Sequence, residues 1–179
     1  DLLKDFPNSM NLYNIIGIAN RDLGKLDEAV KAYNKALSLN PNYAEGFNNM
    51  GIVIQKQGKL EEAIKSYKKA FSIKPSYAEA YFNMGTALQN QGKLDKAIEA
   101  YNKALLHNPN YAQAYYNLGV SQQNQDKLDE AIDAYDKALL LNPNYAEAYY
   151  NLGIAYKAQG KLDKAIDSYK KAISFKPNF

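Results

Sequence analysis

The sequence lacks cysteine and has a single histidine, His107. Without cysteine there is no disulfide, no thiolate zinc site and no cysteine nucleophile. A metal site or an acid–base pair needs converging His, Cys, Asp or Glu side chains, and no such group stands out. No apolar run approaches the roughly 20 residues of a membrane helix, and no glycine-rich phosphate loop occurs. We therefore predict no enzyme, no cofactor, no metal and no membrane insertion.

Charge of one sign is also scarce, because the net charge is only +3. A balance this small does not indicate nucleic acid, so we expect no nucleic-acid partner. Many carboxylates have a lysine four residues on, as in Asp27 with Lys31 and Glu61 with Lys65. This spacing predicts ion pairs on exposed helix faces. No targeting segment is visible, so we expect a soluble chain, with the cytoplasm favoured.

The six prolines are few but strictly periodic, each 34 residues from the next: Pro7, Pro41, Pro75, Pro109, Pro143 and Pro177. A fixed period of this length indicates one supersecondary unit copied along the chain. Aligning the copies gives five full units, residues 10–43, 44–77, 78–111, 112–145 and 146–179. Residues 1–9 resemble the tail of an earlier unit. The chain does not begin with Met, and we interpret it as a piece of a longer protein.

Each unit contains two helical patterns, such as residues 78–90 and 95–106, joined by a short turn. Glycine recurs in that turn, where a chain leaving a helix often needs positive φ. Asp126 replaces it in the fourth unit, and we expect the turn to persist because Asp tolerates the left-handed region. A polar residue after four of the prolines, with Glu or Gln three positions later, predicts a capping box. These pairs are Asn42 with Glu45, Ser76 with Glu79, Asn110 with Gln113 and Asn144 with Glu147.

Small residues recur where two helices have to approach closely. Glycine forms one such column, at residues 17, 51, 85, 119 and 153. Large residues fill the spaces between the small ones, as in the tyrosine column at residues 33, 67, 101, 135 and 169. Glycine inside a helix is unfavourable by about 1 kcal/mol relative to alanine. Its recurrence therefore predicts a packing role, in which a bulky replacement would overpack the helix pair.

Together these residues resemble the tetratricopeptide repeat family. The 34-residue period, an aromatic residue followed four positions on by glycine, the Gly-Lys-Leu turn and the closing proline all match that family's pattern. The resemblance covers all five units, with Tyr or Phe where the family often has Trp. It implies an all-α fold, an α-solenoid in which antiparallel helix pairs form a right-handed superhelix. The first helix of each pair would line a concave groove.

Four columns of first-helix residues would then form the surface of the groove. One column carries the asparagine row, which we define as Asn49, Asn83, Asn117 and Asn151. Asparagine is a mediocre helix former, so its recurrence needs a reason. Its amide suits hydrogen bonding to an extended peptide backbone. The row is similar to the asparagine ladder of O-linked N-acetylglucosamine transferase superhelices, although repeat drift or local capping would also place Asn here.

Three further columns complete the predicted peptide-binding surface. The neighbouring column, as we call it, holds Asn48, Phe82, Tyr116 and Tyr150, where the aromatics would form apolar pockets or pack on adjacent helices. A third column holds Thr86, Val120 and Ile154, and a fourth holds Gln55, Gln89 and Gln123. Relatives that clamp a terminal carboxylate use lysine and arginine on first helices. The matching positions here are uncharged or acidic, which argues against that class.

The leading hypothesis is a non-catalytic scaffold that binds an extended peptide segment of a partner protein. A first alternative is an assembly scaffold that stacks end to end, because no polar capping helix follows Pro177. A second alternative is a substrate-recruiting arm of a larger enzyme, such as a glycosyltransferase. The fourth unit, with five acids and two lysines, reflects either drift on a solvated face or a docking patch for a basic partner.

Overall fold

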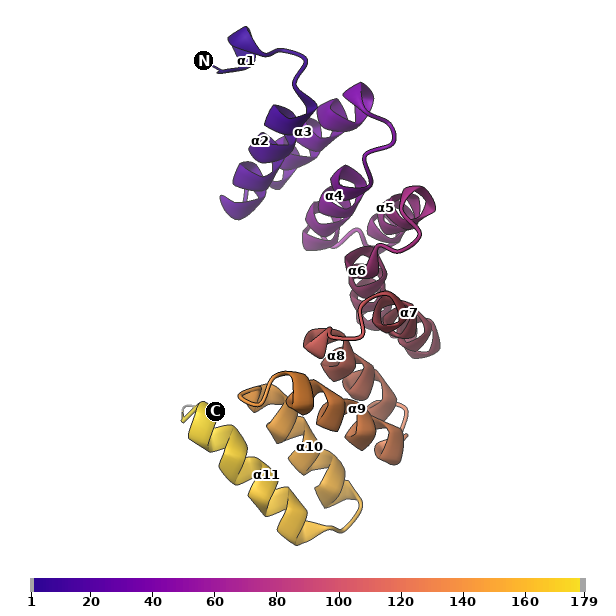
Figure 1. The fold of residues 1–179 in the computed structure, drawn as a ribbon, viewed down its shortest axis with the longest axis vertical. Helices are drawn as coiled ribbons and strands as arrows, with labels where there is room; N and C mark the ends of the chain where they lie inside the picture. Colours follow the sequence, from indigo (N-terminus) through magenta and orange to yellow (C-terminus); the bar gives the residue numbers. More distant parts are fainter. Residues whose placement is uncertain (1, 178–179) are drawn as a thin grey trace. The chain divides into compact units, whose positions relative to one another are not determined.

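The structure is a computed structural model that describes residues 2–177. These residues form α-helices joined by short turns, with no strand among them (Figure 1). The chain divides into two compact units, unit 1 at residues 1–91 and unit 2 at residues 92–179. The division falls between α6 and α7.

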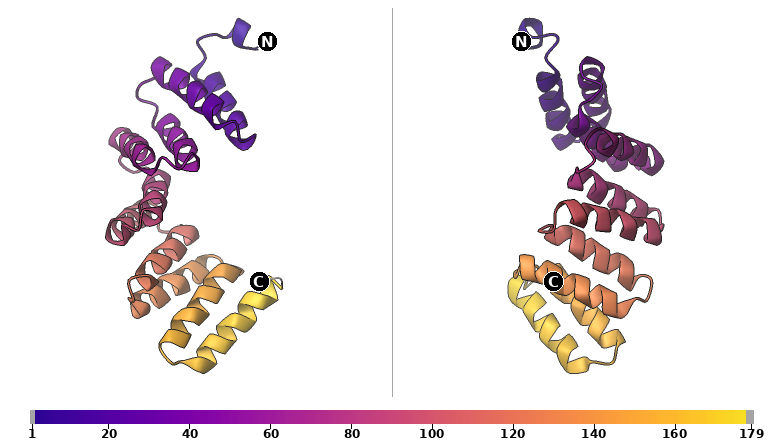
Figure 2. Two further views of the ribbon diagram at one scale, coloured as in Figure 1. Left: turned by 180° about the vertical axis from the view of Figure 1, so that it is seen from behind. Right: turned by 45° about the vertical axis from the view of Figure 1, so that its right-hand side comes forward.

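Unit 1 consists of a short helix followed by longer helices in antiparallel succession (Figures 1 and 2). Its helices are α1 (Leu2–Asp5), α2 (Met10–Asp22), α3 (Leu26–Leu39), α4 (Ala44–Lys56), α5 (Leu60–Ile73) and α6 (Ala78–Asn90). The most extensive contacts join α2 to α3 and α4 to α5. Smaller contacts of α3 with α4 and of α5 with α6 link one pair to the next.

Unit 2 repeats this arrangement. Its helices are α7 (Leu94–His107), α8 (Ala112–Gln123), α9 (Leu128–Leu141), α10 (Ala146–Ala158) and α11 (Leu162–Phe175). Helix α8 pairs with α9 and α10 pairs with α11, while α7 packs on α8 and α9 packs on α10. Each unit is therefore a stack of helix pairs with a core between neighbouring pairs, and the predicted all-α solenoid architecture is confirmed within each unit.

The turn inside each pair has the predicted left-handed residue. Glycine adopts a φ between +71° and +79° at residues 24, 58, 92 and 160, and Asp126 adopts a φ of +61°. The expectation that Asp126 keeps the turn is confirmed. This left-handed conformation is higher in free energy for Asp than for glycine, because the Cβ of Asp approaches the following carbonyl oxygen.

The helix glycines lie against the tyrosine of the second helix. A Cβ added at Gly51 would lie 2.6 Å from Cε1 of Tyr67, and one at Gly119 would lie 2.7 Å from Cε1 of Tyr135. Both tyrosines are fully buried. No side chain fits at these glycines without displacing the ring, so the glycine column is explained by packing.

The predicted capping boxes are wrong. The N-cap of α4 is Tyr43, two residues after Pro41, and no side chain caps the helix; α6, α8 and α10 likewise begin after a tyrosine. The polar residue after proline belongs instead to the preceding turn, where the backbone N–H of Asn42 donates to Oδ1 of Asn40 at 3.0 Å. Oε1 of Glu45 accepts from Nζ of Lys74 at 3.2 Å.

The acids in the first turn of each second helix also differ from expectation. Oδ1 of Asp27 accepts from Nε2 of Gln57 at 2.8 Å, instead of pairing with Lys31. The same bond recurs thirty residues apart between the acid of one repeat and the glutamine of the next, in Glu61 with Gln91, Asp95 with Gln125 and Asp129 with Gln159. These acids therefore tie neighbouring repeats together within each unit.

Candidate functional site

The asparagine row lies half-buried on the first helices, with Asn49 and Asn83 in unit 1 and Asn117 and Asn151 in unit 2. Three of the four amides donate to a side chain 35 residues earlier. Nδ2 of Asn49 donates to Oδ1 of Asn14 at 3.2 Å, and Nδ2 of Asn83 donates to Oδ1 of Asn48 at 3.0 Å. In unit 2, Nδ2 of Asn151 donates to the hydroxyl of Tyr116 at 3.0 Å. One amide proton is thus fixed toward the preceding repeat.

Asn117 differs from the other members of the row. The residue 35 positions before it is Phe82, whose side chain carries no acceptor. Asn117 is half-buried on α8, and its amide makes no hydrogen bond within the described part of unit 2. It is the member of the row whose removal breaks no bond between repeats of that unit.

The neighbouring column does not form the predicted surface as a whole. Asn48 is fully buried and Phe82 is 8% exposed, so neither can present its side chain to a ligand. Asn48 accepts from Asn83, as above, and its Nδ2 lies 3.4 Å from Oε1 of Glu79. Assigning Asn48 and Phe82 to the binding surface was therefore wrong, because the Asn48 side chain is hydrogen-bonded to α6 and the Phe82 side chain is buried.

In unit 2 the neighbouring column is aromatic. Tyr116 is half-buried, and its ring centroid lies 4.9 Å from that of Tyr145. Burial raises the pKa of Tyr116, Glu147 raises it further, and the hydrogen bond from Asn151 opposes both effects. Tyr150 is 41% exposed, with its ring centroid 5.7 Å from that of Tyr169. Tyr116 thus belongs mainly to the packing, whereas Tyr150 is accessible.

The glutamine column accepts hydrogen bonds from buried tyrosines. The hydroxyl of Tyr67 donates to Oε1 of Gln55, and that of Tyr135 donates to Oε1 of Gln123, both at 2.8 Å. Sequence analysis missed these bonds, although a constant spacing of twelve residues between glutamine and tyrosine was a usable signal. Gln89 is half-buried on α6.

The third column contributes partly accessible side chains. Thr86 on α6, Val120 on α8 and Ile154 on α10 are all half-buried. The hydroxyl of Thr86 donates to the backbone oxygen of Phe82 at 3.2 Å, so its methyl group can face outward. The predicted residues that remain accessible in unit 2 are therefore Asn117, Val120, Tyr150, Asn151 and Ile154.

Two cavities lie at the C-terminal end of unit 2. One of about 320 Å³ is lined by Tyr150, Lys157, Tyr169, Ala172 and Ile173. It joins the exposed ring of Tyr150 to an apolar stretch of α11. Its lining combines apolar surface with one cation, which suits an amphipathic ligand segment.

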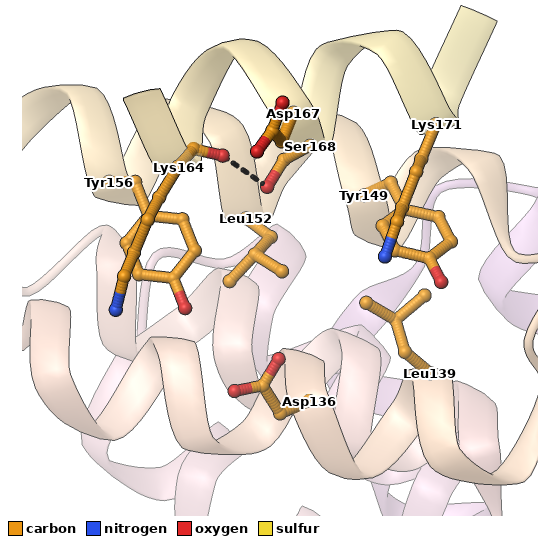
Figure 3. Close-up of a pocket in the computed structure, with 9 residues that line it drawn as sticks. All are labelled: Asp136, Leu139, Tyr149, Leu152, Tyr156, Lys164, Asp167, Ser168 and Lys171. Atoms are coloured by element: carbon orange, nitrogen blue, oxygen red, sulfur yellow. Dashed lines mark hydrogen bonds between the residues drawn. The ribbon is translucent and has the colours of Figure 1, made fainter. Parts of the chain in front are cut away.

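The second cavity, of about 300 Å³, opens between α9, α10 and α11 (Figure 3). Lys164 lies over the ring of Tyr156 at 5.4 Å, and Lys171 lies over that of Tyr149 at 5.2 Å. Desolvation raises the pKa of Asp136 in this cavity, and Asp133 adds to the effect, while the two lysines oppose it. No member of the asparagine row lines this cavity, so it is separate from the row.

The part of the chain that the structure describes contains neither a metal-binding cluster nor a membrane-spanning helix. Within residues 2–177, no three His, Cys, Asp or Glu side chains are grouped so that they could hold a metal ion. His107 is exposed at the last residue of α7. None of the helices in this range has the length and apolar character needed to cross a membrane.

The repeated helix pairs and their glycine–tyrosine contacts define a helical repeat protein. Models of the tetratricopeptide repeat match residues 17–58, 56–92, 78–111, 112–145 and 146–179. The chain therefore belongs to the tetratricopeptide repeat family. Such repeats form scaffolds typical of protein–protein interaction, and proteins built from them are generally non-catalytic.

Solved structures with the same fold include several tetratricopeptide proteins. A crystal structure of MamA is 34% identical, with a TM-score of 0.82, and the match covers 94% of this chain and 92% of that chain. YrrB, described as a TPR protein with an unusual peptide-binding site, is 24% identical, with a TM-score of 0.77 and coverage of 99% and 91%. PilF of Pseudomonas aeruginosa is 21% identical, with a TM-score of 0.86 and coverage of 93% and 76%. No curated protein sequence matches the chain significantly.

Proposed function

We propose that this chain is a non-catalytic scaffold and that, within each unit, the amides of the asparagine row bind an extended segment of a partner protein. The observation that carries the proposal is the fixed orientation of the row amides. Asn49, Asn83 and Asn151 each commit one N–H to the preceding repeat. An amide has two N–H protons and one carbonyl oxygen, so each retains an acceptor and a donor for a ligand.

A peptide backbone offers alternating N–H and C=O groups, which is the pattern that a row of amides complements. Fixing an amide before binding lowers the entropy that is lost when the ligand arrives. The asparagines would therefore bind a chain largely without regard to its side chains. Selectivity would come from the accessible apolar groups beside the row, namely Tyr150, Val120 and Ile154 in unit 2 and Thr86 in unit 1.

YrrB offers a precedent for peptide binding by this fold. At 24% identity the likeness extends to the fold alone, so the proposal for particular residues depends on the asparagines. It also depends on the half-buried state of Asn83, Asn117 and Asn151, which leaves their amides within reach of a ligand.

Asn117 gives the sharpest test, because its removal breaks no bond between repeats within unit 2. Peptides of twelve residues would first be selected from a random display library against the wild-type chain. Their affinity would then be measured by fluorescence anisotropy for wild type, Asn117→Ala and the control Asn102→Ala, which removes an exposed amide from the second helix α7. We expect a loss of about five- to tenfold for Asn117→Ala only.

A backbone-methylated version of the selected peptide adds a second test. Methylation removes the peptide N–H donors and leaves the side chains unchanged, so it should weaken binding to wild type. Equal binding by Asn117→Ala and wild type, together with full binding of the methylated peptide, would show that the row is not the binding surface.

Self-association is a second candidate function, and one observation favours it. On α11, Ile166 is 50% exposed and Ile173 is 54% exposed, whereas Ile132 and Leu139, at the matching positions of α9, are each 8% exposed beneath α10. The same face of α11 would suit another helix pair. Light scattering should then show concentration-dependent association that Ile166→Lys with Ile173→Lys abolishes; a wild-type monomer at high concentration would exclude it.

A further inference from the structure

In two repeats, the hydroxyl of the buried tyrosine on the second helix donates to a side-chain acceptor. In the repeats that contain Tyr67 and Tyr135, that acceptor is the glutamine twelve residues earlier, at 2.8 Å in both cases. A buried hydroxyl without an acceptor is costly, because it has lost its hydrogen bonds to water. The pairing of tyrosine with glutamine is thus part of how these repeats satisfy their interior.

The first repeat breaks this pairing. Tyr33 is fully buried, yet its hydroxyl has no hydrogen-bond partner among the described residues. The residue twelve positions earlier is Arg21 in place of glutamine. A guanidinium has N–H donors and no acceptor, so two donors occupy the place where the repeats of Tyr67 and Tyr135 have a donor and an acceptor.

An exposed ion pair, to Asp22, holds the Arg21 side chain in place. Its Nε donates to Oδ1 of Asp22 at 2.9 Å, and this neighbouring carboxylate is 60% exposed. The Arg21 side chain itself is 22% exposed, and it lies close enough to the Tyr33 phenol to lower the pKa of that group. An exposed ion pair between adjacent residues is weak, and an incoming carboxylate can replace Asp22.

We propose that Arg21 and Tyr33 form a carboxylate-binding site, which takes one acidic side chain of the bound peptide in the first repeat. This inference rests on the proposed peptide-binding function and adds a preference to it. A carboxylate accepts several hydrogen bonds at once, so it can take one from the phenol and two from the guanidinium. Bonds to an ionised acceptor are the stronger ones.

The surroundings of Tyr33 keep the phenol in its donating form. Burial raises the pKa of Tyr33 to about 12; Arg21 lowers it, and Asp22 and Tyr43 raise it. The ring is fully buried and packs closely against Gly17, where an added Cβ would be 2.6 Å from Cε1. The hydroxyl therefore stays fixed and protonated at neutral pH. Arg21 lies in the last turn of α2 and Tyr33 on the second helix α3, whereas the positions that match a terminal-carboxylate clamp are uncharged or acidic in this chain.

The test compares two labelled twelve-residue peptides of serine, threonine and alanine with one central Glu or Gln. Wild type should bind the Glu peptide about tenfold more tightly, which corresponds to a charge-assisted hydrogen bond. Arg21→Gln recreates the glutamine–tyrosine pairing of the repeats that contain Tyr67 and Tyr135, and it should bind both peptides equally. A Glu preference that persists in Arg21→Gln, or is absent in wild type, would overturn the proposal.

Acetate provides a test that does not depend on the peptide surface. Titrating acetate into wild type should shift the ring signals of Tyr33 in a carbon-edited NMR spectrum, and Arg21→Gln should abolish that shift. If neither peptide binds but acetate shifts Tyr33, the proposed function fails and the site stands. If both peptides bind equally and acetate has no effect, the site fails and the function stands.

Stability gives an independent readout with a matched variant in unit 2. Arg21→Gln should raise the unfolding midpoint, because the Tyr33 hydroxyl gains an acceptor. Gln123→Arg should lower it, because the Tyr135 hydroxyl loses its acceptor and the unit 1 mismatch is recreated. A lower midpoint for Arg21→Gln would contradict the donor mismatch on which the site depends.

Discussion

Units 1 and 2 use different residues as the hydrogen-bond acceptor between neighbouring repeats. In unit 1, Nδ2 of Asn83 donates to Oδ1 of Asn48 at 3.0 Å. In unit 2, Nδ2 of Asn151 donates to the hydroxyl of Tyr116, also at 3.0 Å. Asn48 is fully buried and Tyr116 is half-buried. What the units share at this position is an acceptor oxygen for the next repeat.

The change from amide to phenol alters how the acceptor is supported. Asn48 has a polar environment, because its own Nδ2 approaches Oε1 of Glu79. Tyr116 has an aromatic environment, since its ring lies 4.9 Å from that of Tyr145 and 6.1 Å from that of Tyr135. A column that varies from amide to aromatic can therefore be an inter-repeat contact, even when its composition suggests a ligand surface.

The largest expected effect is alkaline unfolding. Burial raises the pKa of Tyr33 in unit 1 and of Tyr145 in unit 2 to about 12, and it also raises that of Tyr67 and Tyr135. The folded chain favours the neutral phenol, so this stability is fully present below pH 10. It is lost between pH 10 and 12, as the unfolded chain ionises. Tyr33 alone should account for about 2–3 kcal/mol.

A variant in unit 2 tests how much one phenol contributes to this pH dependence. Tyr116→Asn gives unit 2 the amide acceptor of unit 1 and removes one phenol whose pKa burial raises. Urea unfolding at several values between pH 10 and 12 should show a pH dependence that is shallower by up to about 1.4 kcal/mol per pH unit than that of wild type. A wild-type stability that stays constant across this range would contradict the burial of the phenols.

The second effect tests what the units have in common. Gly51→Leu in unit 1 and Gly119→Leu in unit 2 should each lower the free energy of unfolding by about 3 kcal/mol, because each side chain would collide with a buried tyrosine ring. Denaturant unfolding checks this, with Ala158→Leu at an exposed helix position as control. If only one glycine variant is destabilised, the units do not share this packing.

The sequence predicted the helix pairs and their turns because those features are local and repeated. Backbone sterics explain why proline ends each second helix, why glycine takes the positive φ at residue 24 and why Asp126 can replace glycine in the fourth turn. The capping-box prediction failed because the backbone N–H of Asn42 donates to Oδ1 of Asn40, which places Asn42 in the preceding turn. Spacing alone could not show that a neighbouring side chain would outcompete the helix N-terminus.

The candidate site was predicted less completely, for a related reason. First-helix position indicated that Asn117 and Asn151 lie at the surface, and both are half-buried. It could not reveal that Asn48 lies buried against α6, because a single position along the helix separates the half-buried Asn49 from the buried Asn48. The donor mismatch of Arg21 and Tyr33 became visible only once the hydroxyl was seen to be buried.

The smallest effect compares the two acceptors, Asn48 in unit 1 and Tyr116 in unit 2, directly. Asn48→Leu removes a fully buried acceptor and leaves Nδ2 of Asn83 without its partner, so it should lower the free energy of unfolding by about 2 kcal/mol. Tyr116→Phe keeps the ring contacts and removes only the hydroxyl. Because Asn151 is half-buried, water can replace that bond, and the loss should be about 1 kcal/mol or less. Urea unfolding of both variants measures the difference; an equal or larger loss for Tyr116→Phe would mean that the phenol, and not the buried amide, is the stronger link between repeats.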